Sequence, residues 1–476
     1  MPNKKRTIFT KILIWRYKYI SERQFILVLS VLVGFLAGLG TVLLKYLTLF
    51  IQSVLEGGFI RNYYFSLYFI FPIVGVWLVY LIKKNFLKKE IGHGISTTLY
   101  AISKRSGIIE RYKMFASLMV APITVGFGGS VGLQGPAVST GAAIGSNVAS
   151  MFHMNAKTRM LLIGCATAGA MSSMFKAPVA AIVFAVEIFS LDLVFTSLVP
   201  LLLASVAAVI TSYFFRGTDV LFSFELLDAW RVKDIIFYVF LGLATGIASV
   251  YFSKMYFLIT RFFAWFSNAY IKIGIAALAI GLMLYLFPPL YGEGYGLINN
   301  LLNGETEAAL NGIQYQIDFN NVWIVIAILL IIAVFKAIAM TTTFAAGGVG
   351  GIFIPTLFMG SALGNSVAKV INQFGFEVSE SNFTLIGMTG LMAGVLHAPL
   401  TAIFLIAEIT GGYDLFVPLM LVATISFGFT KYFVPNSIYT AELAKRGELI
   451  TKDKDKNALM MLNIDRIIET DFIKIS

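Results

Sequence analysis

The sequence predicts an all-α polytopic membrane protein built from two inverted-topology repeats of tilted, broken helices. Three observations lead to this fold class: the composition, a series of long uncharged windows and an internal repeat. Of the 476 residues, 58% are hydrophobic and 13% are charged, and the mean hydropathy is +0.83. A soluble domain carries about 25% charged residues, so this composition excludes a disordered chain, a disulfide-stapled secreted domain and an ordinary cytosolic enzyme.

Windows without Asp, Glu, Lys or Arg recur along the chain at lengths near the roughly 20 residues that one spanning helix needs. They cover residues 24–44, 62–82, 193–215, 235–253, 273–292 and 415–430. Three further uncharged windows, 114–156, 337–368 and 381–407, are rich in Gly, Ser, Thr and Ala. We expect these three to form shorter helices broken by loops, since a membrane tolerates irregular backbone only where protein buries it or where it lines an aqueous cavity.

Both ends of the chain are polar. The segment 1–24 holds seven Lys or Arg against one acid, Glu22, and lacks the apolar core and cleavage site of a signal peptide. We expect it in the cytoplasm because basic flanks stay on that side, so its charge reports topology rather than a nucleic-acid partner. Residues 25–447 form the predicted membrane domain and 448–476 a cytoplasmic tail, and we place the protein in a bacterial inner membrane.

An internal repeat divides the membrane domain. Residues Gly128–Pro136 resemble Gly347–Pro355, 219 positions later, and Lys176–Ile188 matches His397–Ile409, 221 positions later. Close helix packing explains isolated Gly-xxx-Gly spacings but not a nine-residue block that recurs in register. Two homologous halves indicate a transporter or channel whose substrate lies between them near the membrane midplane. The predicted repeats run from about 25 to 216 and from about 233 to 447.

Each repeated block places a glycine run and a proline before a new apolar helix. Pro in the first turn marks a helix start, and the first N–H groups of a helix are unpaired and partly positive. Two such ends converging would hold an anion without any Lys or Arg, and partial charges would also let the ion leave, as conduction requires. The equivalent acids Glu187 and Glu408 are expected to accept hydrogen bonds from neighbouring N–H groups. The sequence therefore favours an anion as the transported species.

Few residues could support catalysis or bind a metal. The chain has one Cys, Cys165, and three His, and it contains no HExxH, CxxC or Walker A motif. We therefore expect no disulfide, metal, cofactor or enzymatic activity. An intramembrane enzyme would need a catalytic dyad or metal ligands, and neither His153 nor His397 has an acid or Cys nearby in the sequence. A receptor or structural role would leave the duplicated broken helices unexplained.

At four motifs, spread over residues 25–447, the chain resembles the CLC family of chloride channels and transporters. The motifs are Gly92–Ser96, where the family usually reads GSGIP; Gly132–Pro136, where it usually reads G(K/R)EGP; Gly351–Pro355, an intact GxFxP; and Ser437–Thr440, around the pore tyrosine. The resemblance implies a homodimer embedded in lipid, with one pathway in each subunit for chloride or another small monovalent anion.

The resemblance also implies which residues contact the anion. A central anion would lie against the N–H groups of Ile352 and Phe353 and the hydroxyl of Tyr439, with His93 as the fourth contact. An outer anion or gate position would use the N–H groups of Leu133, Gln134 and Gly135.

Two departures from the family pattern affect the predicted mechanism. Gln134 stands where the family has its gating glutamate, and an amide cannot ionise. Ile188 stands where proton-coupled members commonly carry a second glutamate. We therefore expect passive, uncoupled anion conduction. The alternatives are an anion/proton exchanger with a non-standard proton route, and a transporter selective for fluoride, nitrate or bicarbonate; Tyr439 argues against the family's fluoride branch.

Three other features carry hypotheses of their own. His93 replaces a usual serine: as a cation it would change anion preference or raise flux at acidic pH, or else it points away and packs against helix ends. Lys336 is an intramembrane charge that either attracts anions to the inner vestibule or snorkels or pairs with an acid. The tail 448–476 resembles the lead-in to a CBS regulatory domain; either that domain is missing from this chain or the tail packs on the membrane domain.

Overall fold

The computed structural model describes residue 16 and residues 18–56, 64–89, 91–92, 94–190, 195–217, 222, 230–313 and 315–448. Across these residues the regular elements are all helical, apart from one isolated β-bridge between Gly132 and Gly351. The predicted all-α fold class is confirmed. His93, most of the basic segment 1–24 and the tail after Glu448 lie outside the described residues.

The first half of the chain supplies eight described α-helices and a short π-helix. They are α2 (Glu22–Glu56), α3 (Tyr64–Ile82), η2 (Lys83–Leu87), α4 (Ile95–Lys104), α5 (Lys113–Gly126), α6 (Gln134–Met151), α7 (Ala156–Phe175), α8 (Pro178–Phe189) and α9 (Phe195–Arg216).

The second half begins with a 3₁₀ turn and continues to the end of the described chain. Its elements are η3 (Val232–Asp234), α10 (Ile235–Ala264), α11 (Ala269–Leu286), η4 (Pro288–Leu290), α12 (Tyr295–Leu302), α13 (Thr306–Ala309), α14 (Val322–Ala345), α15 (Phe353–Gln373), α16 (Glu380–Leu396), α17 (Pro399–Ile409), α18 (Phe416–Phe433) and α19 (Ala441–Lys445).

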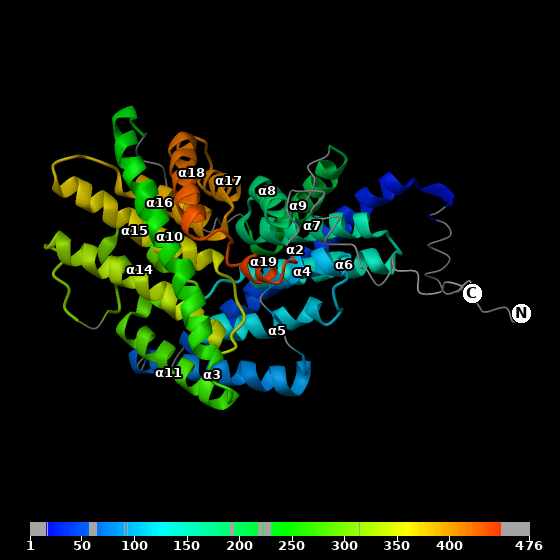
Figure 1. The fold of residues 1–476 in the computed structure, drawn as a ribbon, viewed down its shortest axis with the longest axis horizontal. Helices are drawn as coiled ribbons and strands as arrows, with labels where there is room; N and C mark the ends of the chain where they lie inside the picture. The colour runs from blue at the N-terminus through cyan, green and yellow to red at the C-terminus, as the bar shows by residue number, and fades with distance from the viewer. Residues whose placement is uncertain are drawn as a thin grey trace, which may run out of the picture.

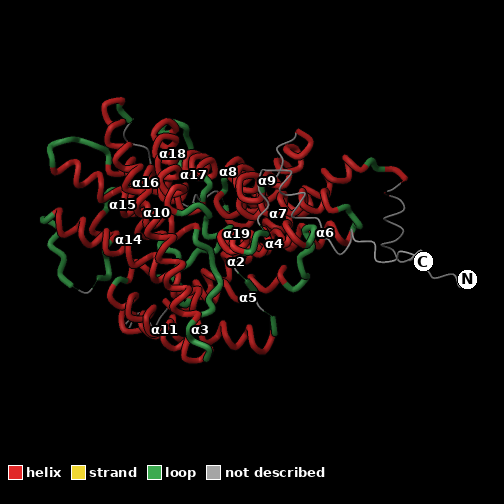
Figure 2. The backbone as a smooth tube through the Cα atoms, in the orientation of Figure 1, coloured by secondary structure: helices red, strands yellow, loops and turns green. Residues whose placement is uncertain are grey.

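Seven helices among the described residues are long and apolar enough to cross a membrane. The Gly-rich windows behave as predicted: 114–156 divides into α5 and α6, 337–368 is broken between α14 and α15, and 381–407 divides into α16 and α17. Figure 2 shows a backbone made mostly of helices joined by loops. Residues 128–133, in the loop before α6, are all buried by protein, which is the condition for irregular backbone at membrane depth.

The two halves lie side by side. Figure 1 shows α10, α14, α15, α16 and α18 on one side of the molecule and α2, α5, α6, α7 and α9 on the other, with α3 packed against α11 below. Equivalent helices make equivalent pairs: α6 packs on α7 as α15 packs on α16, and α2 packs on α9 as α10 packs on α18.

Reciprocal hydrogen bonds between equivalent residues join the halves. Gly132 N–H donates to Gly351 O at 2.9 Å, and Gly351 N–H donates to Gly132 O at 2.7 Å. A second equivalent pair of hydrogen bonds lies next to this bridge. Ser130 N–H donates to Thr343 Oγ1 at 3.2 Å, and Val349 N–H donates to Thr124 Oγ1 at 3.1 Å. In each pair, a residue of one half bonds a residue of the other, and their two equivalents make the same bond in the opposite direction. This reciprocity indicates a twofold relation between the halves.

Two carboxylates repeat this relation at α8 and α17. Glu187, near the end of α8, accepts hydrogen bonds from the first N–H groups of α17, at Leu400 and Thr401. Glu408, near the end of α17, accepts them from Val179 and Ala180 at the start of α8. A carboxylate is stabilised at a helix N-terminus, so both acids hold the halves together. The sequence analysis expected the hydrogen bonds to N–H groups but not that they cross between the halves.

Glycines allow the paired helices to approach closely. A Cβ on Gly141 would lie 2.6 Å from Ala166 O, and a Cβ on the equivalent Gly360 would lie 2.6 Å from Gly387 O. Both distances are far below van der Waals contact, so the α6–α7 and α15–α16 pairs depend on having no side chain there.

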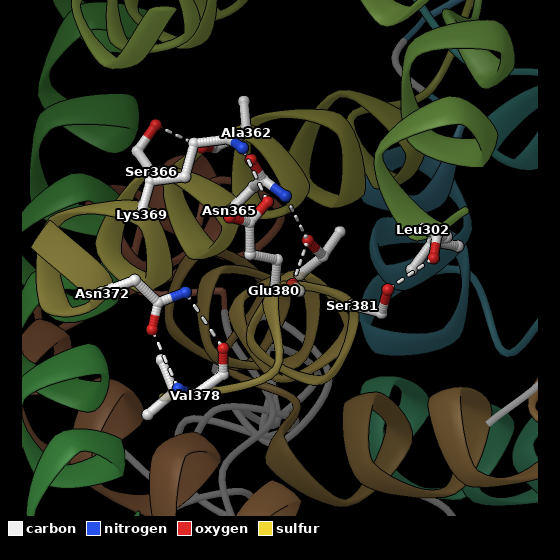
Figure 3. A network of polar contacts seen from close by, with 10 residues as sticks. Leu302, Ala362, Asn365, Ser366, Lys369, Asn372, Val378, Glu380 and Ser381 are labelled. Atoms are coloured by element: carbon white, nitrogen blue, oxygen red, sulfur yellow. Dashed lines mark hydrogen bonds and ion pairs between the residues drawn. The ribbon is translucent and has the colours of Figure 1, made fainter. Parts of the chain in front are cut away.

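Polar side chains tie α15 to α16 and α16 to the end of α12 (Figure 3). The contacts are Lys369 Nζ to Glu380 Oε2 at 2.6 Å, Asn372 Nδ2 to Val378 O at 3.1 Å, Asn365 Nδ2 to Thr384 Oγ1 at 3.3 Å and Ser381 Oγ to Leu302 O at 2.6 Å. These bonds set the direction of α15 and therefore where its first N–H groups point.

A Gly360→Ala substitution should destabilise the protein by roughly 1–3 kcal/mol, because overpacking forces α15 away from α16. The midpoint of thermal unfolding in detergent measures this. Gly428→Ala on α18 is the matched control, since nothing lies within 4 Å of a Cβ there, and its midpoint should not fall. Equal midpoints for the two variants would contradict the close-packing argument.

Candidate functional site

The N-termini of α4, α6 and α15 converge on a small cavity, here called the central cavity. Its volume is about 20 Å³, enough for one water-sized guest. It is lined by Gly94, Ile95, Ser96, Gly135, Tyr256, Phe344, Gly350, Gly351, Ile352, Ile438 and Tyr439. The structure thus brings together Gly135, Ile352 and Tyr439, which the sequence analysis placed at anion positions.

The two central helices begin without a side-chain cap. The N-cap residues are Leu133 for α6 and Ile352 for α15, and neither makes a side-chain hydrogen bond to its helix. The turns before them need glycine, since Gly128 has a φ of 92° and its equivalent Gly347 a φ of 90°. The helix starts therefore offer main-chain N–H groups, and the Gly132–Gly351 bridge holds them face to face.

The hydroxyl of Tyr439 completes the central cavity. It is buried and has no hydrogen-bond partner among the described residues, which is rare for a buried polar atom. Burial raises the pKa of Tyr439, and Tyr256 adds to this effect, so the hydroxyl keeps its proton and can donate it to an anion. Phe353, the first residue of α15, buries its ring against Phe175, with ring centroids 5.2 Å apart.

Tyr439 also lines a second cavity, here called the His397 cavity, with a volume of about 310 Å³. Its lining includes Ile188, His397 and Lys431. Burial lowers the pKa of His397 to about 4, with a contribution from Lys431, so this imidazole is neutral at neutral pH. Ile188, the position at which the CLC resemblance expects a proton-carrying glutamate, therefore faces this cavity as an apolar side chain.

A third cavity, here called the Glu293 cavity, lies beyond the N-terminus of α6 and has a volume of about 540 Å³. Its lining includes Lys45 on α2, Leu133, Glu293 and Tyr295. Leu133 lines this cavity and Gly135, two residues later, lines the central cavity. The start of α6 thus separates the Glu293 cavity from the central cavity, and Tyr439 separates the central cavity from the His397 cavity.

Gln134 is directed toward the Glu293 cavity. Its side chain is 1% exposed, and its Nε2 donates to Tyr295 Oη at 3.2 Å and to Glu293 Oε1 at 3.5 Å. Glu293 Oε1 also accepts the main-chain N–H of Leu133 at 3.1 Å. An acid from a distant segment thus lies at the position where the sequence analysis expects an outer anion. The sequence analysis missed Glu293; the glycines on both sides of it, at 292 and 294, are the only local signal of a special backbone there.

Lys336 lies beneath the loop that carries Glu293. It is fully buried, and its ammonium donates to Gly292 O at 3.0 Å and to Leu290 O at 3.4 Å. It lies 4.6 Å from the ring centroid of Phe358. The structure thus places this charge against the carbonyl groups of the loop that carries Glu293.

Comparison with known proteins identifies the family. Residues 74–431 match the family model described as voltage gated chloride channel. The chain belongs to this family. A relative from Vibrio cholerae, the H(+)/Cl(-) exchange transporter ClcA, is 26% identical over 439 residues, covering 87% of this chain and 88% of its own. The voltage-gated ClC-type chloride channel ClcB of Salmonella typhimurium is 26% identical over 343 residues, covering 70% of this chain and 75% of its own.

Solved structures support the same fold. The structure of a slow cyanobacterial Cl⁻/H⁺ antiporter superposes with a TM-score of 0.75 at 19% sequence identity, covering 90% of this chain and 98% of its own. The voltage-gated chloride channel family thus includes relatives named as exchangers and relatives named as channels. Which of the two mechanisms operates in this chain depends on the residues along its three cavities.

Replacing Tyr439 with Phe should weaken chloride binding about 10- to 100-fold, because a hydrogen bond to a charged group is worth about 1.5–3 kcal/mol. Titration calorimetry on the detergent-solubilised protein measures the affinity. Tyr432→Phe is the matched control, because Tyr432 is 82% exposed, and it should bind chloride as the wild type does. Unchanged affinity in the Tyr439→Phe variant would remove that hydroxyl from the site.

Proposed function

We propose that the protein conducts chloride, or a similar small monovalent anion, down its gradient and without proton coupling. The observation that carries this proposal is the order of the three cavities. An anion entering the Glu293 cavity meets the start of α6, then the N–H groups and Tyr439 hydroxyl of the central cavity, and then the His397 cavity. Partly positive main-chain groups bind an anion without trapping it.

Two side chains favour uncoupled conduction. Gln134 at the start of α6 has no ionisable group, and Ile188 in the lining of the His397 cavity cannot carry a proton. Proton exchange requires a titratable group at each end of the proton route. These two positions, where the family resemblance expects such groups, supply none.

The functional unit that we propose is a homodimer in a lipid membrane, with one complete pathway in each subunit. The proposed central contacts are the N–H groups of Ile352 and Phe353 and the Tyr439 hydroxyl, with His93 as a fourth contact. The outer contacts are the N–H groups of Leu133, Gln134 and Gly135.

A second candidate is anion/proton exchange by a non-standard route. The observation that favours it is the Glu293 carboxylate beside Gln134, with Oε1 and Nε2 3.5 Å apart, because this acid could carry a proton where Gln134 cannot. Selectivity for fluoride, nitrate or bicarbonate would use the same central cavity, and Tyr439 favours chloride over the fluoride alternative.

Simultaneous recording of chloride and proton fluxes from purified protein in liposomes distinguishes the two candidates. We expect chloride efflux that requires a potassium ionophore to balance its charge, with no accompanying proton uptake. Protein-free liposomes are the control. Anion-driven proton movement with a reproducible stoichiometry would contradict uncoupled conduction and support the exchanger.

A further inference from the structure

The carboxylate of Glu293 lies where an outer anion would bind. Its Oε1 accepts the N–H of Leu133 at 3.1 Å, the side-chain amide of Gln134 at 3.5 Å and the hydroxyl of Tyr295 at 3.4 Å. Glu293 is only 8% exposed, and its exposed edge lines the Glu293 cavity. An anion can therefore accept the N–H of Leu133 only if it displaces the Glu293 carboxylate from that group.

The loop that carries Glu293 is held in place by its main chain. Lys336 bonds Gly292 O and Leu290 O, and Ser130 Oγ donates to Leu290 O at 2.7 Å. Gly294 has a φ of 82°, which favours glycine. These contacts anchor the backbone of the loop, so a change in the position of the Glu293 carboxylate would require rotation of its side chain.

We propose that Glu293 is the gate of the outer anion position: its carboxylate occupies the N-terminus of α6 when ionised and releases it to an anion when protonated. This proposal rests on the proposed anion conduction and names the residue that regulates it. An ionised carboxylate and an anion repel each other at this position. A protonated carboxyl is neutral, and its O–H can donate to the arriving anion.

The charges around Glu293 come from several elements. Lys45 on α2 faces it across the cavity, Lys336 on α14 lies beneath its loop, and Tyr295 on α12 and Gln134 on α6 bond it directly. Arg216, at the end of α9, interacts electrostatically with Lys45 and Tyr295. Burial raises the pKa of Glu293, while Lys45 and the hydrogen bonds from Leu133, Tyr295 and Gln134 lower it.

The sign of the pH dependence follows from this chemistry. The gate is closed by the ionised form, so chloride flux should rise as the pH on the side of the Glu293 cavity falls through the pKa of Glu293. Above that pKa the protonated fraction of a single carboxyl changes about tenfold per pH unit, and the flux should follow it. Ile188 supplies no proton carrier at its own position in the His397 cavity, and Glu187, which also lines that cavity, accepts hydrogen bonds from the start of α17. We therefore expect protonation to open the pathway without driving proton transport.

Liposome flux assays on three variants test the gate. Glu293→Gln imitates the protonated carboxyl and should conduct at neutral pH as fast as the wild type does at acidic pH, with no further dependence on pH. Lys45→Gln removes a charge that lowers the pKa of Glu293, so its midpoint should move to higher pH. Glu305→Gln makes the same amide substitution at an exposed acid outside these three cavities and should keep the wild-type profile.

The outcomes separate this proposal from the proposed function. A Glu293→Gln variant that conducts with the wild-type pH profile would overturn the gate and leave anion conduction intact. Absence of chloride flux from the wild type and from Glu293→Gln at every pH would overturn both. If Glu293 only stabilised the fold, Glu293→Gln would lower flux equally at all pH values, which would also overturn the gate.

A measurement on the unaltered protein covers the case in which Glu293→Gln fails to fold. By reciprocal linkage, a proton that favours chloride binding must itself be bound more tightly when chloride is present. Calorimetric titration with chloride in buffers of different ionisation enthalpy should show proton uptake by the wild type and by Lys45→Gln, with the uptake shifted to higher pH in Lys45→Gln. Absence of uptake between pH 4 and 9 would overturn the gate.

Discussion

The pairing of Gly132 with Gly351 is the constraint on which the rest of the pathway depends. It brings two helices from opposite halves of the chain to begin at the same point in the interior, and equivalent residues return each other's hydrogen bonds on both sides of it. Because helix starts leave N–H groups unpaired, this pairing concentrates partial positive charge where the membrane would otherwise exclude an anion.

The distribution of full charges complements this arrangement. Among the residues that the structure describes, no Lys or Arg lines the central cavity, while Lys45 lines the Glu293 cavity and Lys431 the His397 cavity. In the proposed pathway, full charges in the wider cavities would attract anions, and partial charges at the narrowest point would bind them weakly enough for release. Glu293 adds a titratable negative charge at the start of α6, between the wide Glu293 cavity and the narrow central cavity. A gate at this position would control the entry of anions into the central cavity.

Sequence patterns predicted the architecture well, for identifiable reasons. The repeat at 219 residues anticipated that the starts of α6 and α15 converge, because duplicated segments fold into equivalent elements. The sequence analysis expected Glu187 and Glu408 to accept hydrogen bonds from neighbouring N–H groups, but not that these groups begin a helix of the opposite half. Glu293 could not be predicted, because no motif or equivalent acid in the repeat connects it to Leu133, 160 residues away in the chain. The place of Lys336, against the carbonyls of the Glu293 loop, likewise depends on a long-range contact.

Bromide-soaked crystals would show whether main-chain groups or formal cations bind the transported anion, because bromide replaces chloride and scatters anomalously. We expect an anomalous peak in the central cavity, within hydrogen-bonding distance of Tyr439 Oη and the N–H groups of Ile352 and Phe353. An empty central cavity, with bromide found only beside Lys45 or Lys431, would contradict the claim that main-chain groups rather than formal cations bind the transported anion.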